Sequence, residues 1–106
     1  MATIIWSDHA LESLRAQARY IAEQSCSAEI ALRWANDVCG EADRLADFPD
    51  IGHPIPEISE TPYREIIIRK NFRLIYRRSH DVCYIVTVRR CSMLLDETTI
   101  AELDSV

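Results

Sequence analysis

The sequence of 106 residues lacks most of the features that mark specialised classes of protein. It holds only two glycines and four prolines, and it contains no repeat or low-complexity tract. No stretch approaches the roughly 18 consecutive apolar residues that a membrane span needs. The start, MATIIWSDHA, has neither the basic segment nor the long apolar run of a secretory signal. We therefore expect a soluble cytoplasmic protein with no membrane partner.

The cysteines show none of the spacings that metal sites or disulfide frameworks require. Cys26, Cys39, Cys83 and Cys91 are scattered, without a CxxC motif or a pair of histidines at ligand spacing. We interpret them as reduced thiols and expect neither a metal nor a cofactor. Hydrophobic residues make up 48% of the chain, enough to bury a core without cross-links. We expect one domain over residues 1–106.

Charge is unevenly distributed along the chain, although its net value is only −5. Residues 63–90 hold eight Lys and Arg against two Asp and Glu, whereas the segments on either side are acidic. An acidic chain is a poor general binder of nucleic acid, so we expect no direct sequence-specific contact with DNA or RNA. A local basic surface can still attract an anionic partner, although a run of charge is as often only a solvated face.

The basic segment also carries the strongest strand pattern. β-branched and aromatic residues crowd three runs, because such residues suit a half-buried pleated surface. The runs are Tyr63–Arg69, Phe72–Arg78 and Val82–Arg89. Short polar segments separate them, and we expect Asn71 and Asp81 to adopt the tight backbone conformations of the turns. The pattern predicts a meander of three antiparallel strands.

Two amphipathic helices are predicted before the meander. Apolar residues recur at three- and four-residue spacing over residues 8–24, and a second such pattern runs to about Ala46. Caps are available from Ser7 or Asp8 for the first helix and from Ser25 or Ser27 for the second. The short polar break between the two helices predicts a helical hairpin.

The remaining segments complete an α+β fold of order β-α-α-β-β-β. Thr3–Trp6 predicts a first strand, which pairs at the edge of the meander or beside its middle strand. The connector FPDIGHPIPE, residues 48–57, ends all helix because its prolines lack N–H groups, and Gly52 permits a positive φ. We expect the hairpin to cover one face of a small antiparallel sheet. We expect residues 91–95 to extend the last strand and residues 96–106 to form a short helix or tail.

Alternation along the middle strand separates two faces of the predicted sheet. Arg73 and Arg77 share one face, because successive side chains of a strand point to opposite sides. Phe72, Leu74 and Tyr76 share the other face, which we assign to the helices.

The arginines opposite the helices are candidates for binding an anion. Arg64 and Arg89 are expected to join Arg73 and Arg77, so that this face forms a groove of guanidinium groups suited to carboxylates or phosphates. The alternative is that these arginines pair inside the chain, with Glu57, Glu65 or the acidic tail.

In their order and spacing, these segments resemble the RelE/ParE superfamily of type II toxin–antitoxin toxins, often labelled plasmid stabilisation proteins. The resemblance covers nearly all of residues 3–90. It is carried by RYI at 19–21, FPDIGHPIPE at 48–57, YREI at 63–66, FRLIY at 72–76 and IVTVRR at 85–90. It implies a toxin that a cognate antitoxin neutralises, with a toxin–antitoxin heterotetramer as an expected assembly. The antitoxin is then the ligand expected on Arg64, Arg73, Arg77 and Arg89.

The superfamily divides by mechanism, and the residues favour one branch. RelE-like members resemble ribosome-dependent mRNA endonucleases, which need a base, a cation and an acid at one phosphate. Arg73 matches their cation and Glu57 is the available base, but Cys91 and Ser92 stand where these nucleases place a His or Tyr, and neither is a comparable acid. We expect a ParE-like toxin, a branch that acts by binding DNA gyrase. The alternatives are a RelE-like nuclease and a non-toxic homologue that only binds antitoxin.

Overall fold

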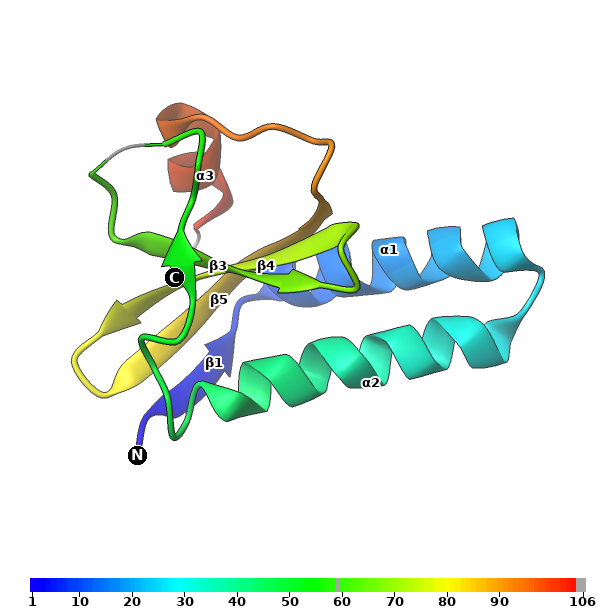
Figure 1. Ribbon diagram of the computed structural model, residues 1–106, viewed down its shortest axis with the longest axis horizontal. Coiled ribbons are helices and arrows are strands. Elements are labelled where there is room, and N and C mark those ends of the chain that lie inside the picture. The colour runs from blue at the N-terminus through cyan, green and yellow to red at the C-terminus, as the bar shows by residue number, and fades with distance from the viewer. Residues whose placement is uncertain (59, 105–106) are drawn as a thin grey trace.

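The computed structural model describes residues 1–58 and 60–104, which form five strands and three helices. Strand β1 (Thr3–Trp6) is followed by helices α1 (Asp8–Ser25) and α2 (Ala28–Arg44). The chain continues with β2 (His53–Pro54), β3 (Tyr63–Ile68), β4 (Phe72–Ser79), β5 (Val82–Arg90) and α3 (Glu97–Leu103). Figure 1 shows α1 and α2 as a long hairpin beside the sheet, with α3 across the strands from it. No helix within the described ranges is long and apolar enough to cross a membrane.

The strands form one sheet of order β1-β5-β4-β3-β2. The meander is antiparallel, as predicted, with Ile68 opposite Phe72 and Ser79 opposite Val82 at its two hairpins. β1 lies at the edge, which is one of its two expected positions, and pairs with β5 in parallel. The α+β class with its helical hairpin is confirmed. The sheet is mixed rather than wholly antiparallel, because the two helices form the crossover that a parallel pair requires.

The structure departs from the expected elements at both ends of the meander. Residues 53–54 of the connector pair with β3 and form the short strand β2. The sequence did not predict this strand, because a proline normally argues against one. Beyond the meander, β5 stops at Arg90 and residues 91–95 turn away from it, with the Met93 amide donating to the Arg90 carbonyl at 3.0 Å. The acidic segment does form a helix, α3, with Asp96 as its N-cap. The last two residues of the predicted tail lie outside the described ranges.

Serine side chains start both long helices. The Ser7 hydroxyl accepts a hydrogen bond from the Ala10 amide at 3.0 Å, and the Ser27 hydroxyl accepts one from the Ile30 amide at 3.2 Å. Each bond satisfies an amide that has no partner within its helix. Cys26 ends α1 in the left-handed region, with a φ of 54°. The helix boundaries therefore follow from local sequence, within two residues of those predicted.

The turns place their left-handed residues earlier than expected. Arg69 and Lys70 have φ values of 51° and 68°, and His80 has 55°. Asn71 and Asp81, which we expected to take up the tight conformations, do not have a positive φ. The strands stay paired up to the last residue before each turn, so the chain reverses at the first residues of the loop. Strand register therefore overrides residue preference here.

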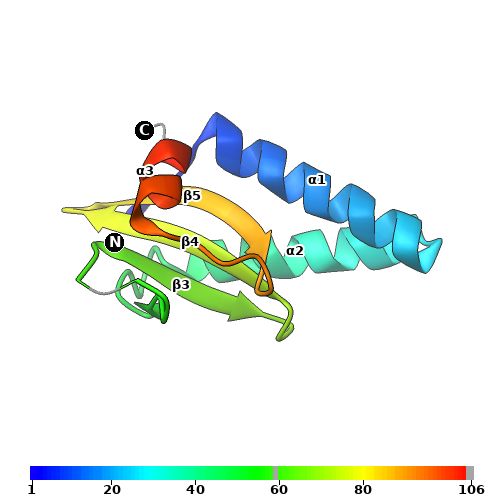
Figure 2. The same ribbon diagram turned by 90° about the horizontal axis from the view of Figure 1, so that it is seen from above.

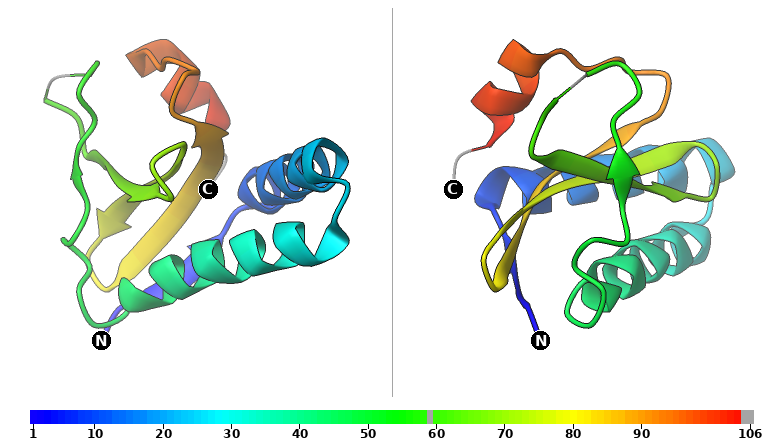
Figure 3. Two further views of the ribbon diagram at one scale, coloured as in Figure 1. Left: turned by 45° about the vertical axis from the view of Figure 1, so that its right-hand side comes forward. Right: turned by 60° about the vertical axis from the view of Figure 1, so that its left-hand side comes forward.

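Apolar side chains cover both faces of the sheet. On one face, residues of α2 pack on β4 and β5, and these include Trp34, Val38, Ala42, Leu74, Tyr76 and Ile85. On the other face, α3 and the connector bring together Ile55, Ile58, Ile75, Val86, Leu95 and Ile100. The hairpin and α3 thus lie on opposite sides of the strands (Figure 3). The face opposite the hairpin is not the open groove that we expected, because the connector and α3 bury it.

Candidate partner-binding site

Arg73 lies beneath the connector, with 4% of its side chain exposed. Its Nη1 and Nη2 atoms donate to the two carboxylate oxygens of Glu57 at 2.8 and 2.6 Å. Nη1 also lies 3.3 Å from a carboxylate oxygen of Glu65, and Nη2 donates to the Met93 carbonyl at 2.7 Å. The alternative of pairing within the chain is therefore what this structure shows for Arg73.

The pairing shifts the pKa values of both partners. Hydrogen bonds from Arg73, helped by the Leu95 amide at 3.0 Å, lower the pKa of Glu57 to about 2. The same bonds raise the pKa of Arg73. A carboxylate with so low a pKa takes up a proton weakly at neutral pH and is a poor general base. Glu57 is thus a structural anion that holds the connector and residue 95 on the sheet.

Arg77 and Arg64 are also engaged by groups of their own chain. Arg77 Nε donates to the Asp104 carboxylate, to which the Tyr63 hydroxyl also donates at 2.9 Å. Burial and the nearby Asp104 raise the pKa of Tyr63 to about 12. Arg64 Nη1 donates to the Gly52 carbonyl at 2.8 Å. Arg77 therefore attaches the end of α3 to the sheet, while Arg64 holds the connector.

The two arginines that end β5 differ from those of β3 and β4. Arg89 lies opposite Arg73 and Arg90 lies opposite Phe72, so that their side chains leave opposite faces of the strand. In both, the buried Nε atom has no hydrogen-bond partner, and within the described ranges neither guanidinium forms an ion pair. Burial and the charge of Arg73 lower the pKa of Arg89. Among the arginines of β3, β4 and β5 in the described ranges, Arg89 and Arg90 are therefore the two whose guanidinium groups remain open to an external anion.

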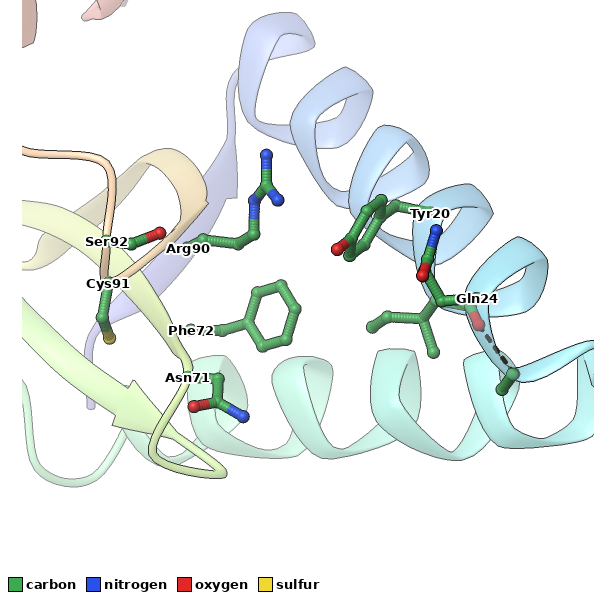
Figure 4. A pocket seen from close by; sticks show the side chains of 9 residues that line it. Tyr20, Gln24, Asn71, Phe72, Arg90, Cys91 and Ser92 are labelled. Atoms are coloured by element: carbon green, nitrogen blue, oxygen red, sulfur yellow. Dashed lines mark hydrogen bonds between the residues drawn. The ribbon is translucent and has the colours of Figure 1, made fainter.

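A hollow of about 570 Å³ lies beside Arg90, between the end of α1 and the β3–β4 turn (Figure 4). One wall consists of Tyr20, Ile21, Gln24 and Ser25, and the other of Asn71, Phe72, Arg90, Cys91 and Ser92. The Arg90 guanidinium carbon lies 4.7 Å from the centre of the Tyr20 ring. Burial raises the pKa of Cys91, which keeps its thiol protonated at neutral pH. The hollow therefore combines one cation with aromatic and apolar walls.

Arg90 and Tyr20 were not among the site residues predicted from the sequence. Both lie in motifs that carry the family resemblance, Tyr20 in RYI at 19–21 and Arg90 at the end of IVTVRR. A tyrosine near the end of an amphipathic helix is normally a packing residue. Because Tyr20 and Arg90 lie far apart in the sequence, no local pattern indicates that the guanidinium group and the aromatic ring are in contact. The signal appears only when α1 is placed along β5, as Figure 2 shows.

No group of three or more His, Cys, Asp or Glu residues in the described part of the chain is placed to hold a metal ion. Within residues 1–58 and 60–104, the guanidinium groups of this region fall into two classes: Arg64, Arg73 and Arg77 bind carboxylates or carbonyls of the same chain, whereas Arg89 and Arg90 form no ion pair.

Comparison with known proteins agrees with this architecture. Residues 4–95 match the family model described as the ParE toxin of the type II toxin–antitoxin system, parDE. A solved structure titled "Chromosomal ParDE TA system from P. aeruginosa" shares the fold, with a TM-score of 0.70 and 22% identity over 85% of this chain and 96% of that chain. Comparison with curated proteins gave no match. Since the family model spans most of the sequence, the chain belongs to the ParE toxin family of type II toxin–antitoxin systems.

Proposed function

We propose that this chain is a cytoplasmic toxin that acts by binding a protein target, DNA gyrase, and that a cognate antitoxin neutralises it. Membership of the ParE family supports the toxin class and an antitoxin partner. The observation that supports binding rather than RNA cleavage is the bidentate pair between Arg73 and Glu57.

Because of that pair, neither residue is available for the role that it would have in a nuclease. Cleavage through a 2′-hydroxyl needs a base that takes up a proton and a cation that faces the phosphate. Both carboxylate oxygens of Glu57 accept hydrogen bonds from Arg73, and its pKa of about 2 makes it a weak base. Arg73 is almost fully covered. The thiol of Cys91, near the position of the nuclease acid, has a raised pKa.

We further propose that the antitoxin contacts the basic strands at Arg89. Of the four arginines assigned to antitoxin binding, Arg64, Arg73 and Arg77 bind groups of their own chain, and Arg89 has no ion-pair partner in the described ranges. An antitoxin reaches Arg73 or Arg77 only if it displaces Glu57 or Asp104. A toxin dimer bridged by antitoxins that bind in this way forms a heterotetramer.

Inducible expression of the gene, with and without the gene beside it, tests the proposed function. We expect growth arrest together with a change in plasmid supercoiling, and we expect the neighbouring gene to relieve both. Primer extension on translated messages should show no new 5′ ends, and purified protein should inhibit gyrase supercoiling in vitro. New message ends with normal supercoiling would identify a nuclease instead. Harmless expression would identify a homologue that only binds antitoxin.

A further inference from the structure

Residues of α1 line two hollows where this helix passes the end of β5. The larger one, around Arg90, is lined on the α1 side by Tyr20, Ile21, Gln24 and Ser25. A second, of about 190 Å³, is lined by His9, Ser13, Ala16 and Gln17 of α1 and by Thr87, Val88, Arg89, Met93 and Leu103. Residues 9 to 25 of a helix span roughly 24 Å. A ligand that reaches both hollows must therefore be elongated and cover most of the length of α1.

The larger hollow has the chemistry of a site for a carboxylate with an apolar neighbour. The buried Nε atom of Arg90 has no hydrogen-bond partner in the described ranges, and the guanidinium carbon lies over the Tyr20 ring, 4.7 Å from its centre. Phe72 and Ile21 line the same space. A charge beside apolar walls is poorly solvated, so an incoming carboxylate gains more from this guanidinium than from one in open water.

The remaining lining groups suit a peptide. The side chains of Gln24, Asn71 and Ser92 are exposed at the rim, where they can donate to and accept from a peptide backbone. A nucleic-acid strand fits less well, since its backbone carries a charge at every nucleotide and the space beside Arg90 holds a single cation. Figure 4 shows Arg90 and Tyr20 pointing into the same space from opposite walls.

We propose that this hollow binds an acidic and apolar segment of the antitoxin, with a carboxylate on Arg90 and a bulky apolar side chain between Tyr20 and Phe72. This inference rests on the proposed function, since it assumes an antitoxin partner. The segment continues along α1 toward Arg89, whose unpartnered Nε offers a second contact for a carboxylate. The binding surface thus lies at the α1–β5 edge rather than on the covered face of the sheet.

Calorimetry with the full chain and the antitoxin encoded beside its gene tests the proposal. Arg90→Gln keeps the length of the side chain but removes its charge, and Gln24→Glu places a competing carboxylate at the rim. We expect each variant to raise the Kd roughly tenfold or more, because a desolvated charge pair is lost or opposed. The control is Arg33→Gln on α2, whose exposed guanidinium pairs with Glu29 at 2.6 Å, and its Kd should stay within about twofold. Thermal unfolding of each variant checks that the fold is kept.

A synthetic peptide of the antitoxin's most acidic segment provides a second measurement. Replacing its Glu residues by Gln one at a time should identify one position that weakens binding to the wild-type chain and has little further effect on Arg90→Gln, since the two changes remove the same contact. Wild-type-like antitoxin binding by both Arg90→Gln and Gln24→Glu would overturn this inference and leave the proposed function standing. Failure of the wild-type chain to bind the antitoxin would overturn both.

Discussion

Arg73 and Glu57 are joined by two hydrogen bonds, of 2.8 and 2.6 Å, across the face of the sheet that α3 and the connector cover. The arginine comes from β4 and the carboxylate from the connector, 16 residues earlier. The same carboxylate accepts from the Leu95 amide, so one ion pair holds three separate segments together. This ion pair has a structural role, and we expect its removal to lower the free energy of unfolding more than it affects partner binding.

Lowering the pH should destabilise the protein, because Glu57 becomes protonated and loses its ion pair with Arg73. Its folded pKa of about 2 lies below its ordinary value of 4.5, so the stability that it contributes is full above pH 4.5 and is lost as the pH falls toward 2. The contribution is smaller than the full shift implies, because solvent screens a carboxylate that is partly exposed. Urea unfolding at a series of pH values measures it. The variant Glu57→Gln should have a lower free energy of unfolding at pH 7, and this free energy should change less between pH 4.5 and 2 than that of the wild type. Parallel profiles of unfolding free energy against pH for the two proteins would contradict the assignment.

Arg73→Gln should destabilise the protein strongly. The change leaves Glu65, with 3% of its side chain exposed, and Glu57 without their cation. Breaking a buried pair on one side costs about 3 to 5 kcal/mol. Chemical denaturation should show this loss, while Arg33→Gln, in an exposed pair on α2, should change stability by less than about 1 kcal/mol. Equal changes in unfolding free energy for the two substitutions would mean that the ion pairs of Arg73 do not stabilise the fold.

Asp104→Asn should loosen α3 and lower the pKa of Tyr63. The carboxylate receives Arg77 Nε and the Tyr63 hydroxyl, and its charge helps to hold the pKa of Tyr63 at about 12. Without that charge, the pKa should fall toward the ordinary value of 10, although burial still raises it. NMR titration of ring-labelled tyrosine measures the shift, and hydrogen exchange of residues 97–103 should become faster. Glu102→Gln, at an exposed position of α3, is the control and should leave Tyr63 unchanged.

Gly52→Ala and Gly40→Ala should shift stability in opposite directions. A Cβ at Gly52 would lie 2.6 and 2.7 Å from Cε1 and the hydroxyl of Tyr76, to which the Gly52 amide donates at 2.9 Å. Overpacking of this kind costs about 1 to 3 kcal/mol. A Cβ at Gly40, inside α2, meets nothing within 4 Å, and Ala is favoured over Gly in a helix by about 1 kcal/mol. Thermal unfolding of both variants decides this, and a stabilised Gly52→Ala would refute the close approach.

The role of Gly52 shows why parts of the fold escaped prediction. From the sequence we expected this glycine to permit a positive φ, and the structure gives no glycine a positive φ in the described ranges. Gly52 instead makes room for the Tyr76 ring of β4, a contact between residues 24 positions apart. Turn chemistry can be predicted from neighbouring residues, whereas close packing depends on an element that the local pattern does not contain.

The arginines of the meander show the same division at the candidate site. Alternation correctly separated Phe72, Leu74 and Tyr76, which face the helices, from Arg73, because the side-chain period of a strand is a local property. Alternation could not show what would cover the arginine face. The charges that bind Arg73 and Arg77 come from Glu57 and Asp104, which lie 16 and 27 residues away.

By itself, the sequence determined the order of the long strands and helices, the meander and the family resemblance, because periodicity, capping and motif spacing are properties of short segments. Only the tertiary structure decided that β1 pairs in parallel at the edge, that α3 closes the sheet face, and that Arg90 meets Tyr20 across a hollow. These features depend on which distant segments come together. Packing of the whole chain sets that arrangement, and with it which arginines stay available to a partner.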